Sequence, residues 1–511
     1  MRALPIALLS LLLVGAPALA FDCTALTGTA IPKSAISLPT SGAVVTSASL
    51  VLDPRRGNFC KLRGAIKPVD PAAPDINFQV NLPEQWNGKA VQQGGGGFNG
   101  SLVTGESNNT GLLPIRMGYV SFGSDSGHQS TIRDASFALN AEAFDNFKGA
   151  QLKKTHDVAF ELVRRAFHAK PRQMYFVGGS EGGREALIVA ERWPEDYHGM
   201  VSIFPAFDIS VLGTAFVQAA QDVFGRPGAW VSPAKLSHLS AKVLDACDGL
   251  DGLKDGIVGN VTACRAAFDA NSLRCGTDAS ADCLSDAQLA AVRSLASPRK
   301  IGVTLSGVDT LAPWPLLESD ITPGSTAFGS SEDVTKSGVG GLGGGTVCYL
   351  TLQQANCDYM QFDAAAQAGP LQTLSREIDV QGALVPFSKR GGKLLLVAGS
   401  SDMLIPPGNT VAYYERLKTA YGAALPDFAR FYMVPGMAHG GGGGNFAMDW
   451  DALSVLDSWV TKAKAPGAQI VTDAIKATAG RTRPLCEYPA YPRYNGSGDV
   501  NQAASFSCAM P

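Results

Sequence analysis

The sequence predicts an α/β fold in which an inserted segment interrupts a mostly parallel β-sheet. Apolar strands alternate with loops and amphipathic helices from residue 76 to about residue 205, and this alternation returns after about residue 385. Between the two stretches lie clustered cysteines, aspartate-rich loops and a glycine-rich patch. We therefore predict a core formed by residues 21–205 and 386–511, with a lid of residues 206–385 inserted into it.

The elements of the core are expected in a regular order. Residues 76–82 alternate apolar and polar side chains as a half-buried strand does, and residues 151–167 place apolar side chains on one helix face. Further strands are expected at residues 90–93, 119–123, 174–177, 393–399 and 431–434, a further core helix at 184–192, and lid helices at 232–246 and 285–295. The glycine-rich patch covers residues 338–345.

The first 20 residues have the pattern of a secretory signal peptide. Arg2 precedes an apolar stretch at residues 6–14, and Ala18-Leu19-Ala20 forms a small-residue cleavage motif. The apolar stretch is too short to span a bilayer with ease, and no other segment of the sequence is long and apolar enough to do so. We expect a mature chain that begins near Phe21 and is secreted or periplasmic.

Composition excludes several classes of partner and points to disulfide bonds. The 511 residues carry a net charge of −3 at pH 7, which argues against nucleic acid and against an anionic membrane surface. All ten cysteines follow the signal, and an even number in an exported chain indicates disulfides. Many connectivities are possible, but the spacings suggest five local pairs: Cys23–Cys60, Cys247–Cys264, Cys275–Cys283, Cys348–Cys357 and Cys486–Cys508. No C-x-x-C motif is present, which makes a redox motif or a zinc ribbon an unlikely interpretation.

The motif GGSEGG at residues 178–183 is the most informative stretch of the chain. It follows the expected strand at 174–177 and precedes the expected helix at 184–192. A glycine-flanked serine between a strand and a helix is the arrangement of a nucleophile elbow, in which only glycine tolerates the close backbone approach. The motif predicts Ser180 as a nucleophile, although G-x-S-x-G also arises by chance and needs partners.

Asp402 and His439 are the expected partners of Ser180. Each lies in a loop directly after an expected strand, and their order along the chain is that of serine hydrolases with an α/β core. The alternative for Asp402 is a turn or helix-cap residue, and for His439 a loop histidine beside a glycine tract. His128 follows a core strand and is either a pocket residue or a packed histidine. The remaining histidines are expected to be packed or at the surface: His156, His168, His198 and His238.

An enzyme that transfers an acyl group also needs N–H donors for the oxyanion. The N–H of Glu181, directly after Ser180, is one expected donor, and the glycine loop (residues 94–97) is expected to supply another. Phosphate binding by the glycine loop is a weak alternative, because it lacks both a P-loop lysine and the spacing of a dinucleotide fingerprint.

The acidic loop (residues 247–257) predicts a bound cation. Asp248, Asp251 and Asp255 are too interspersed with glycine for a helix, and three carboxylates so close together repel one another unless a cation gathers them. Carbonyl oxygens of Leu253 and Ile257 could complete an oxygen shell for a hard cation, although the spacing is not that of an EF-hand. The alternative is an acidic loop that is simply solvated.

Together these motifs make the chain resemble the tannase and feruloyl esterase family, which includes the mono(2-hydroxyethyl) terephthalate hydrolases. The resemblance covers nearly all of the mature chain except the middle of the lid. It is carried by residues 94–100 (GGGGFNG), 178–187 (GGSEGGREAL), 247–257 (CDGLDGLKDGI), 434–439 (VPGMAH), 481–486 (RTRPLC) and 496–499 (GSGD).

The resemblance implies an α/β-hydrolase core with an inserted lid. It implies Ser180, Asp402 and His439 as the catalytic triad and Gly97 and Glu181 as oxyanion donors. It also implies a structural Ca²⁺ held by the carboxylates and carbonyls of the acidic loop: Asp248, Asp251, Leu253, Asp255 and Ile257.

One departure from the family pattern concerns two glycines. Members of the family typically carry a disulfide between a cysteine just before the serine and another just after the histidine, where this chain has Gly179 and Gly440. Cys348 and Cys357 are therefore expected to form a lid disulfide of their own. No pocket residue between about residues 305 and 379 can be assigned from the resemblance.

Three functions are compatible with these observations. The leading expectation is hydrolysis of small aromatic or phenolic acid esters through an acyl-enzyme. A terephthalate half-ester or another small aromatic ester is the alternative substrate, and a cation in the pocket would favour a substrate with a free carboxylate. A non-catalytic binding protein on a hydrolase scaffold is the alternative from a different class.

Overall fold

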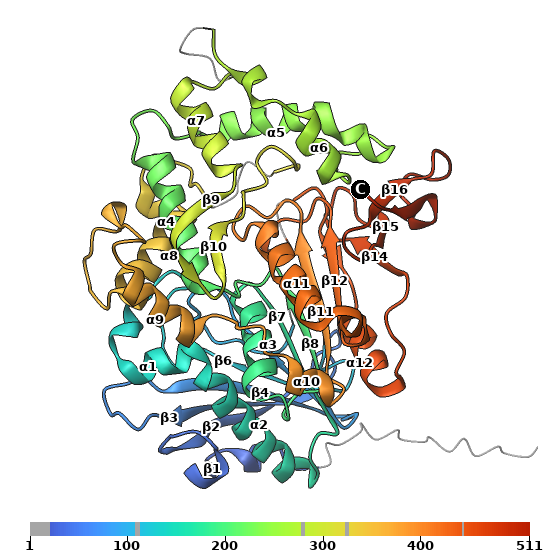
Figure 1. The fold of residues 1–511 in the computed structure, drawn as a ribbon. Helices are drawn as coiled ribbons and strands as arrows, with labels where there is room; N and C mark the ends of the chain where they lie inside the picture. The colour runs from blue at the N-terminus through green and yellow to red at the C-terminus, as the bar shows by residue number, and fades with distance from the viewer. Residues whose placement is uncertain (1–20, 108–112, 277–281, 322–326, 442–443) are drawn as a thin grey trace, which may run out of the picture.

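The computed structural model describes residues 21–107, 113–276, 282–321, 327–441 and 444–511 (Figure 1). Within these residues, ten strands form one central sheet in the order β1-β2-β3-β4-β6-β5-β7-β8-β11-β12. Their bounds are β1 Ala30–Ile31, β2 Gly42–Val51, β3 Phe59–Lys67, β4 Ile76–Pro83, β5 Lys89–Gln93, β6 Val120–Ser124, β7 Gln173–Gly179, β8 Gly199–Ile203, β11 Lys393–Gly399 and β12 Ala429–Val434. Each strand expected from the sequence is present, with its ends shifted by at most a few residues.

The sheet is mixed, so the prediction of a mostly parallel sheet was wrong for its N-terminal half. Strands β6, β5, β7, β8, β11 and β12 pair in parallel, whereas β1 to β4 pair antiparallel with one another and β4 pairs antiparallel with β6. Short connections join β2 to β3 and β3 to β4, and such connections allow only antiparallel neighbours, because a parallel pair needs a long crossover. The motifs predicted to be catalytic all follow strands of the parallel half.

Helices cover both faces of the parallel half. In β11, Leu394 and Leu396 pack on one side with α2, α3 and α11, and Leu395 and Val397 pack on the other side with α12. This alternation follows from the two-residue period of a strand buried on both faces. The core helices are α1 Ala141–Asp145, α2 Gln151–Phe167, α3 Glu181–Arg192, α10 Val385–Lys389, α11 Pro407–Tyr421 and α12 Ala452–Lys462.

The segment predicted as a lid lies over the carboxyl ends of the parallel strands (Figure 1, green to gold), and its apolar side chains form one cluster with core residues such as Phe147 and Ile405. It contains α4 Ile209–Phe224, α5 Pro233–Cys247, α6 Val261–Ala267, α7 Asp286–Leu295, β9 Arg299–Leu305, β10 Val308–Leu311, α8 Gly338–Gly345 and α9 Ala368–Ile378. β9 and β10 pair only with each other in the described part of the chain.

The glycine-rich patch is a helix, α8, which the sequence did not predict because glycine is a poor helix former. Tertiary packing explains the helix. A Cβ on Gly343 would lie 3.0 Å from the Cβ of Phe216 in α4, and a Cβ on Gly213 in α4 would lie 2.2 Å from Thr346, just after α8. The absence of side chains therefore lets α4 and α8 pack backbone against backbone.

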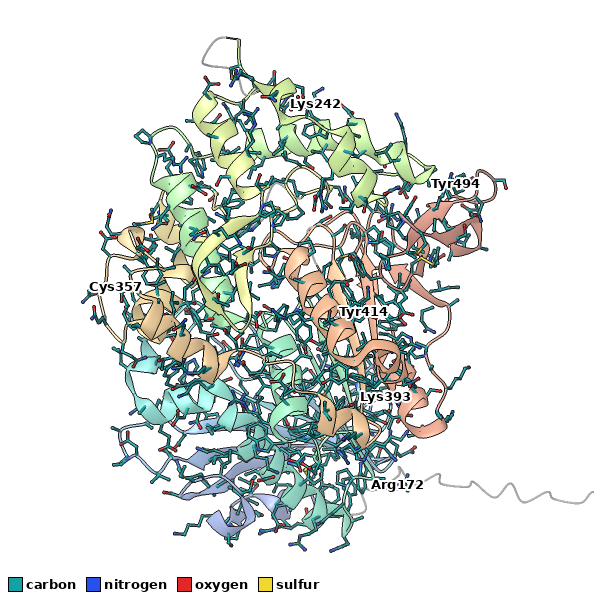
Figure 2. The ribbon with its side chains drawn as sticks, viewed as in Figure 1. Arg172, Lys242, Cys357, Lys393, Tyr414 and Tyr494 are labelled. Carbon is teal, nitrogen blue, oxygen red and sulfur yellow. A yellow bond between two sulfur atoms is a disulfide. The ribbon has the colours of Figure 1, made fainter. Side chains whose placement is uncertain are left out.

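Five disulfides join the cysteine pairs suggested by the sequence spacings, and no described cysteine is free. Cys348–Cys357 lies in the lid, where Figure 2 labels Cys357. The C-terminal strands are β13 Met448–Asp449, β14 Gln469–Asp473, β15 Thr482–Leu485, β16 Tyr491–Tyr494 and β17 Phe506–Ala509. Cys486–Cys508 links the end of β15 to β17. Tyr494, at the end of β16, lies at the outer edge of this region (Figure 2).

The predicted signal peptide lies outside the described residues. Across the residues that are described, no helix has the length and apolar character needed to cross a bilayer.

We predict opposite effects of alanine at two neighbouring glycines of α8. A Cβ on Gly340 would lie 2.0 Å from the backbone oxygen of Val334, whereas a Cβ on Gly341 meets only Arg133 Cδ at 3.5 Å. Gly340→Ala should therefore lower the melting temperature, and Gly341→Ala should raise stability by up to about 1 kcal/mol through helix propensity. Thermal unfolding of both variants checks this, and equal effects would contradict the packing described for α8.

Candidate active site

Ser180 occupies a strained turn between β7 and α3. β7 ends at Gly179 and α3 begins at Glu181, and Ser180 between them has φ 60° and ψ −122°. A non-glycine residue with such angles costs free energy that its surroundings must offset. The Ser180 N–H donates to Ile203 O at 2.9 Å, and the Ser180 carbonyl accepts from the N–H groups of Gly183 and Ala206 at 3.0 Å each. The predicted nucleophile elbow is therefore held by the next strand and its loop.

The structure brings Ser180, His439 and Asp402 together. His439 Nε2 lies 3.0 Å from Ser180 Oγ, and His439 Nδ1 lies 2.8 Å from Asp402 Oδ2. The histidine reaches both partners because the loops after β7, β11 and β12 meet at the carboxyl edge of the parallel strands. This geometry would allow proton transfer from the serine to the histidine.

Asp402 is held in one orientation. It is only 1% exposed, and its Oδ1 accepts the N–H groups of Leu404 and Ile405 at 2.8 Å each. Its Oδ2 is thus left to accept the Nδ1–H of His439. That hydrogen bond selects the tautomer in which Nε2 has a free lone pair toward Ser180.

The glycine loop and the first residue of α3 face the same cavity as Ser180. Gly97 has φ +58°, and a Cβ there would lie 2.2 Å from Ile132 O, so only glycine fits this position. Glu181 is the first residue of α3, where backbone N–H groups have no acceptor four residues earlier in the helix. The two residues predicted as oxyanion donors therefore line the same cavity as the serine.

The cavity at Ser180 has a volume of about 450 Å³ and is lined by both the core and the lid. Ile209, Leu212 and Phe216 of α4 form one lid wall, and Leu342 of α8 and Thr346 form another. The sequence reasoning missed these residues, although the glycine-rich patch beside Leu342 marked where a helix could approach closely. The apolar walls of the cavity suit an aromatic ligand.

An aromatic side chain fills the space beside Gly179, one of the two glycines that depart from the family pattern. The Phe204 ring lies 4.7 Å from the His439 ring, and a Cβ on Gly179 would lie 2.7 Å from Phe204 Cε2. Gly440 has φ +73° and open space where its Cβ would be. Phe204 therefore contacts both the serine turn and the histidine loop.

His128 does not line the cavity. Its side chain is 2% exposed, and its ring stacks on Phe137 with centroids 3.8 Å apart. Burial lowers the pKa of His128 to about 4, so the ring is neutral at ordinary pH. It is a packed residue, which was one of the two interpretations left open by the sequence.

The acidic loop is folded on its own backbone. Asp248 Oδ1 accepts the N–H groups of Asp255 and Gly256 at 3.1 Å, and Asp251 accepts those of Leu253 and Gly259 at the same distance. Within the described residues, no three His, Cys, Asp or Glu side chains lie close enough together to hold a metal ion. The three carboxylates predicted to bind Ca²⁺ therefore do not converge on one point in this structure.

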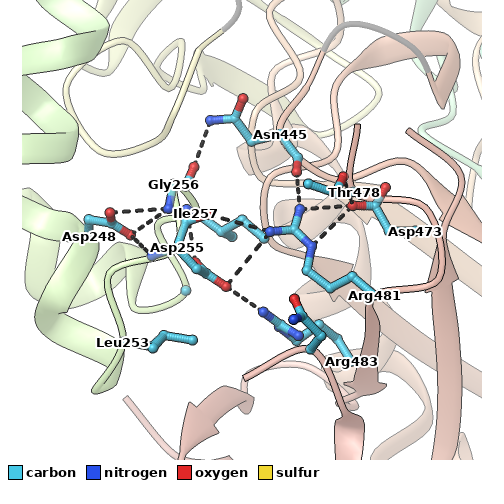
Figure 3. A network of polar contacts seen from close by, with 12 residues as sticks. Asp248, Leu253, Asp255, Gly256, Ile257, Asn445, Asp473, Thr478, Arg481 and Arg483 are labelled. Atoms are coloured by element: carbon cyan, nitrogen blue, oxygen red, sulfur yellow. Dashed lines mark hydrogen bonds and ion pairs between the residues drawn. The ribbon is translucent and has the colours of Figure 1, made fainter. Parts of the chain in front are cut away.

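The charges of the loop nevertheless suit a cation. Asp255 pairs with Arg483, and Arg481 lies beside it and bonds Asp473 at 2.8 Å (Figure 3). Asp248 and Asp251 form no ion pair with any described residue. Burial raises the pKa of Asp251 to about 7, and the charges of Asp255 and Asp248 add to the rise. A cation beside Asp248 and Asp251 would relieve this repulsion.

Comparison with known proteins identifies the family. The sequence profile of the family "Tannase and feruloyl esterase" matches residues 60–509. The chain belongs to the tannase and feruloyl esterase family. It is therefore an esterase, that is, a carboxylic ester hydrolase, and not a non-catalytic binding protein.

Relatives and solved structures agree with this placement. An uncharacterized esterase of Agrobacterium fabrum is 39% identical over 95% of this chain and 93% of its own length. The mono(2-hydroxyethyl) terephthalate hydrolase of Piscinibacter sakaiensis is 32% identical over 88% of this chain and 85% of its own. The crystal structure of feruloyl esterase B from Aspergillus oryzae superposes with a TM-score of 0.76 and 22% identity, covering 93% of this chain and 98% of that one. The fold is that of an α/β-hydrolase.

Proposed function

We propose that this esterase hydrolyses small aromatic or phenolic acid esters with Ser180 as nucleophile, His439 as general base and acid, and Asp402 as its orienting carboxylate. The observation that carries the proposal is the continuous line of hydrogen bonds from Asp402 through His439 to Ser180. Ser180 and His439 line a cavity with apolar walls, which supports an aromatic substrate.

The reaction follows from these positions. His439 Nε2 takes the proton from Ser180 Oγ as the oxygen attacks the ester carbonyl, and the carbonyl oxygen becomes negatively charged. The N–H groups of Gly97 and Glu181 are the proposed donors to that oxygen. His439 then protonates the leaving alcohol, which leaves an acyl-enzyme. Water, deprotonated by His439, releases the aromatic acid and restores Ser180.

A second candidate substrate class is a half-ester with a free carboxylate, and Arg133 is the observation that favours it. Arg133 is the single lysine or arginine side chain that lines the cavity within the described residues, and it is exposed. Its Nη1 donates only weakly, at 3.4 Å, to the Lys336 carbonyl, and it forms no ion pair with a described residue. A carboxylate on the far side of a substrate ring would pair with this guanidinium.

We also propose a structural Ca²⁺ in the acidic loop. Asp248, Asp251 and Asp255 with the carbonyls of Leu253 and Ile257 would hold it, after the carboxylates turn from the loop backbone toward the ion. The raised pKa of Asp251 and the absence of an ion pair at Asp248 and Asp251 within the described residues support a cation here. The ion would neutralise the loop and would not take part in the reaction.

Secretion or export to the periplasm is proposed for the mature chain. The pattern of residues 1–20 and the five disulfides support it, because such bonds persist in oxidising compartments.

Replacement of the nucleophile tests the central proposal. Ser180→Ala should lower kcat for p-nitrophenyl butyrate on the order of a million-fold, the loss typical of triad serines. The melting temperature should fall little, since only a hydroxyl is removed. A fluorophosphonate should label the wild type and not Ser180→Ala. Equal labelling of both proteins would mean that another residue is the nucleophile.

The Arg133 hypothesis is tested with a charged and a neutral substrate. Arg133→Gln should lower kcat/KM for mono(2-hydroxyethyl) terephthalate about fivefold, which is equivalent to ~1 kcal/mol for an exposed ion pair. The kcat/KM for methyl benzoate, which has no free carboxylate, should not change. Lys336→Gln, which removes a neighbouring charge that does not line the cavity, is the matched control. An equal loss on both substrates would contradict charge recognition.

Chelation tests the metal proposal. EGTA should lower the melting temperature and excess Ca²⁺ should restore it, since a ligand at 100 times its Kd stabilises by about 2.7 kcal/mol. Asp251→Asn should abolish this response, whereas Asp245→Asn, an exposed carboxylate of α5, should retain it. A melting temperature that changes with neither EGTA nor Ca²⁺ would rule out the site.

A further inference from the structure

Glu185 is a buried carboxylate close to the site to which the reaction above assigns no part. It lies on α3, five residues after Ser180, and is 2% exposed. Unlike its neighbour Glu181, which pairs with Arg184, Glu185 forms no ion pair with a described residue. A buried carboxylate needs hydrogen-bond donors to remain in place, so its partners show what it does.

Two partners of Glu185 lie on either side of Gly97, one within the glycine loop and one just after it. Its Oε2 accepts the backbone N–H of Gly95 at 3.0 Å, and its Oε1 accepts the side-chain N–H of Asn99 at 2.9 Å. Gln151 Nε2 donates to Oε1 at 3.0 Å. Asn99 lies four positions after Gly95, and the proposed oxyanion donor Gly97 lies midway between them.

Gly95 is held by α3 through both of its backbone polar groups. While its N–H donates to Glu185, its carbonyl accepts the N–H of Gly182 at 2.9 Å. The Gly182 bond is a backbone contact that any residue at 185 would leave possible. The Gly95 N–H, in contrast, depends on the Glu185 side chain for its acceptor.

We propose that Glu185 is a positioning residue for catalysis: it holds Gly95 and Asn99, on either side of Gly97, so that the Gly97 N–H stays directed at the carbonyl oxygen of the substrate. The inference rests on the proposed function, since it requires an oxyanion at Gly97. Glu185 does not line the cavity, and its hydrogen bonds go to Gly95, Asn99 and Gln151. Its effect therefore falls on stabilisation of the transition state and not on binding of the substrate.

Glu185→Ala and Glu185→Gln are the variants that test the role. The alanine variant leaves the Gly95 N–H without its acceptor. The glutamine variant keeps the size but offers one acceptor oxygen to the three donors. Glu191→Ala is the matched control: Glu191 lies on the same helix and accepts the backbone N–H groups of residues 381–383, far along the chain from the glycine loop.

The measurements separate a positioning role from a structural one. With p-nitrophenyl butyrate, Glu185→Ala should lower kcat by about 10- to 100-fold, below the 10²–10³ seen when an oxyanion donor is lost outright, with KM within about twofold. The inhibition constant of phenylboronic acid, which forms a tetrahedral adduct on the serine, should rise by a similar factor. That of benzoate, a planar product-like competitor, should not change. Glu191→Ala should change none of these values at a temperature where it is folded.

Two results would overturn the proposal. The first is a folded Glu185→Ala with wild-type kcat and wild-type affinity for phenylboronic acid. If Glu185→Ala does not fold, Glu185→Gln decides: it should show the same pattern to a smaller degree, and unchanged kcat and boronate affinity would refute the role. Failure of the proposed function is distinguishable, because the wild type would then not be labelled at Ser180 by a fluorophosphonate.

Discussion

The active site depends on the close approach of two glycine backbones, Gly94 in the glycine loop and Gly182 in the first turn of α3. A Cβ on Gly94 would lie 2.4 Å from Gly182 Cα, and one on Gly182 would lie 2.8 Å from the carbonyl carbon of Gly94. This approach lets the Gly182 N–H reach the Gly95 carbonyl and places the glycine loop directly against the first turn of α3. The strained backbone of Ser180 is tolerated because the neighbouring strand and loop satisfy its polar groups.

Charged contacts join the lid and the C-terminal strands to the rest of the fold, in addition to apolar packing. Arg184 is fully buried beside Glu181 and donates to the carbonyls of Ile378, at the end of α9, and Phe147, in the core. Such a buried pair is costly to desolvate, but its additional hydrogen bonds offset that cost and specify one arrangement. Asp255 pairs with Arg483 in the same way and connects the acidic loop to the C-terminal strands (Figure 3). The lid is thus placed over the serine by directional contacts as well as by packing, which matters because the lid forms much of the cavity wall.

The contact between α4 and α8, which is made through glycines, places residues of both helices in the wall of the cavity. Where two helices pack through glycine, their axes approach closely. Phe216 of α4 and Leu342 of α8 both line the cavity that Ser180 lines. Part of the cavity wall therefore comes from the lid, whereas Ser180, Asp402 and His439 and the rest of the wall come from the core.

The sequence by itself determined features that depend on neighbours along the chain: strands β4 to β7, β11 and β12, helices α2, α3, α5 and α7, the serine turn, the order of Ser180, Asp402 and His439, and the five local disulfides. Tertiary structure decided the rest. Hydrogen bonding between Ser180 and His439 spans 259 positions, and the pairing of Asp255 with Arg483 spans 228, so no local pattern could establish either contact. α8 is helical despite its glycines because contact with α4 outweighs intrinsic propensity, and the N-terminal strands are antiparallel because their connections are short. The role of Glu185 also became visible only in the fold, since a glutamate on a predicted helix gives no sign that its acceptor atoms meet a loop 90 residues earlier.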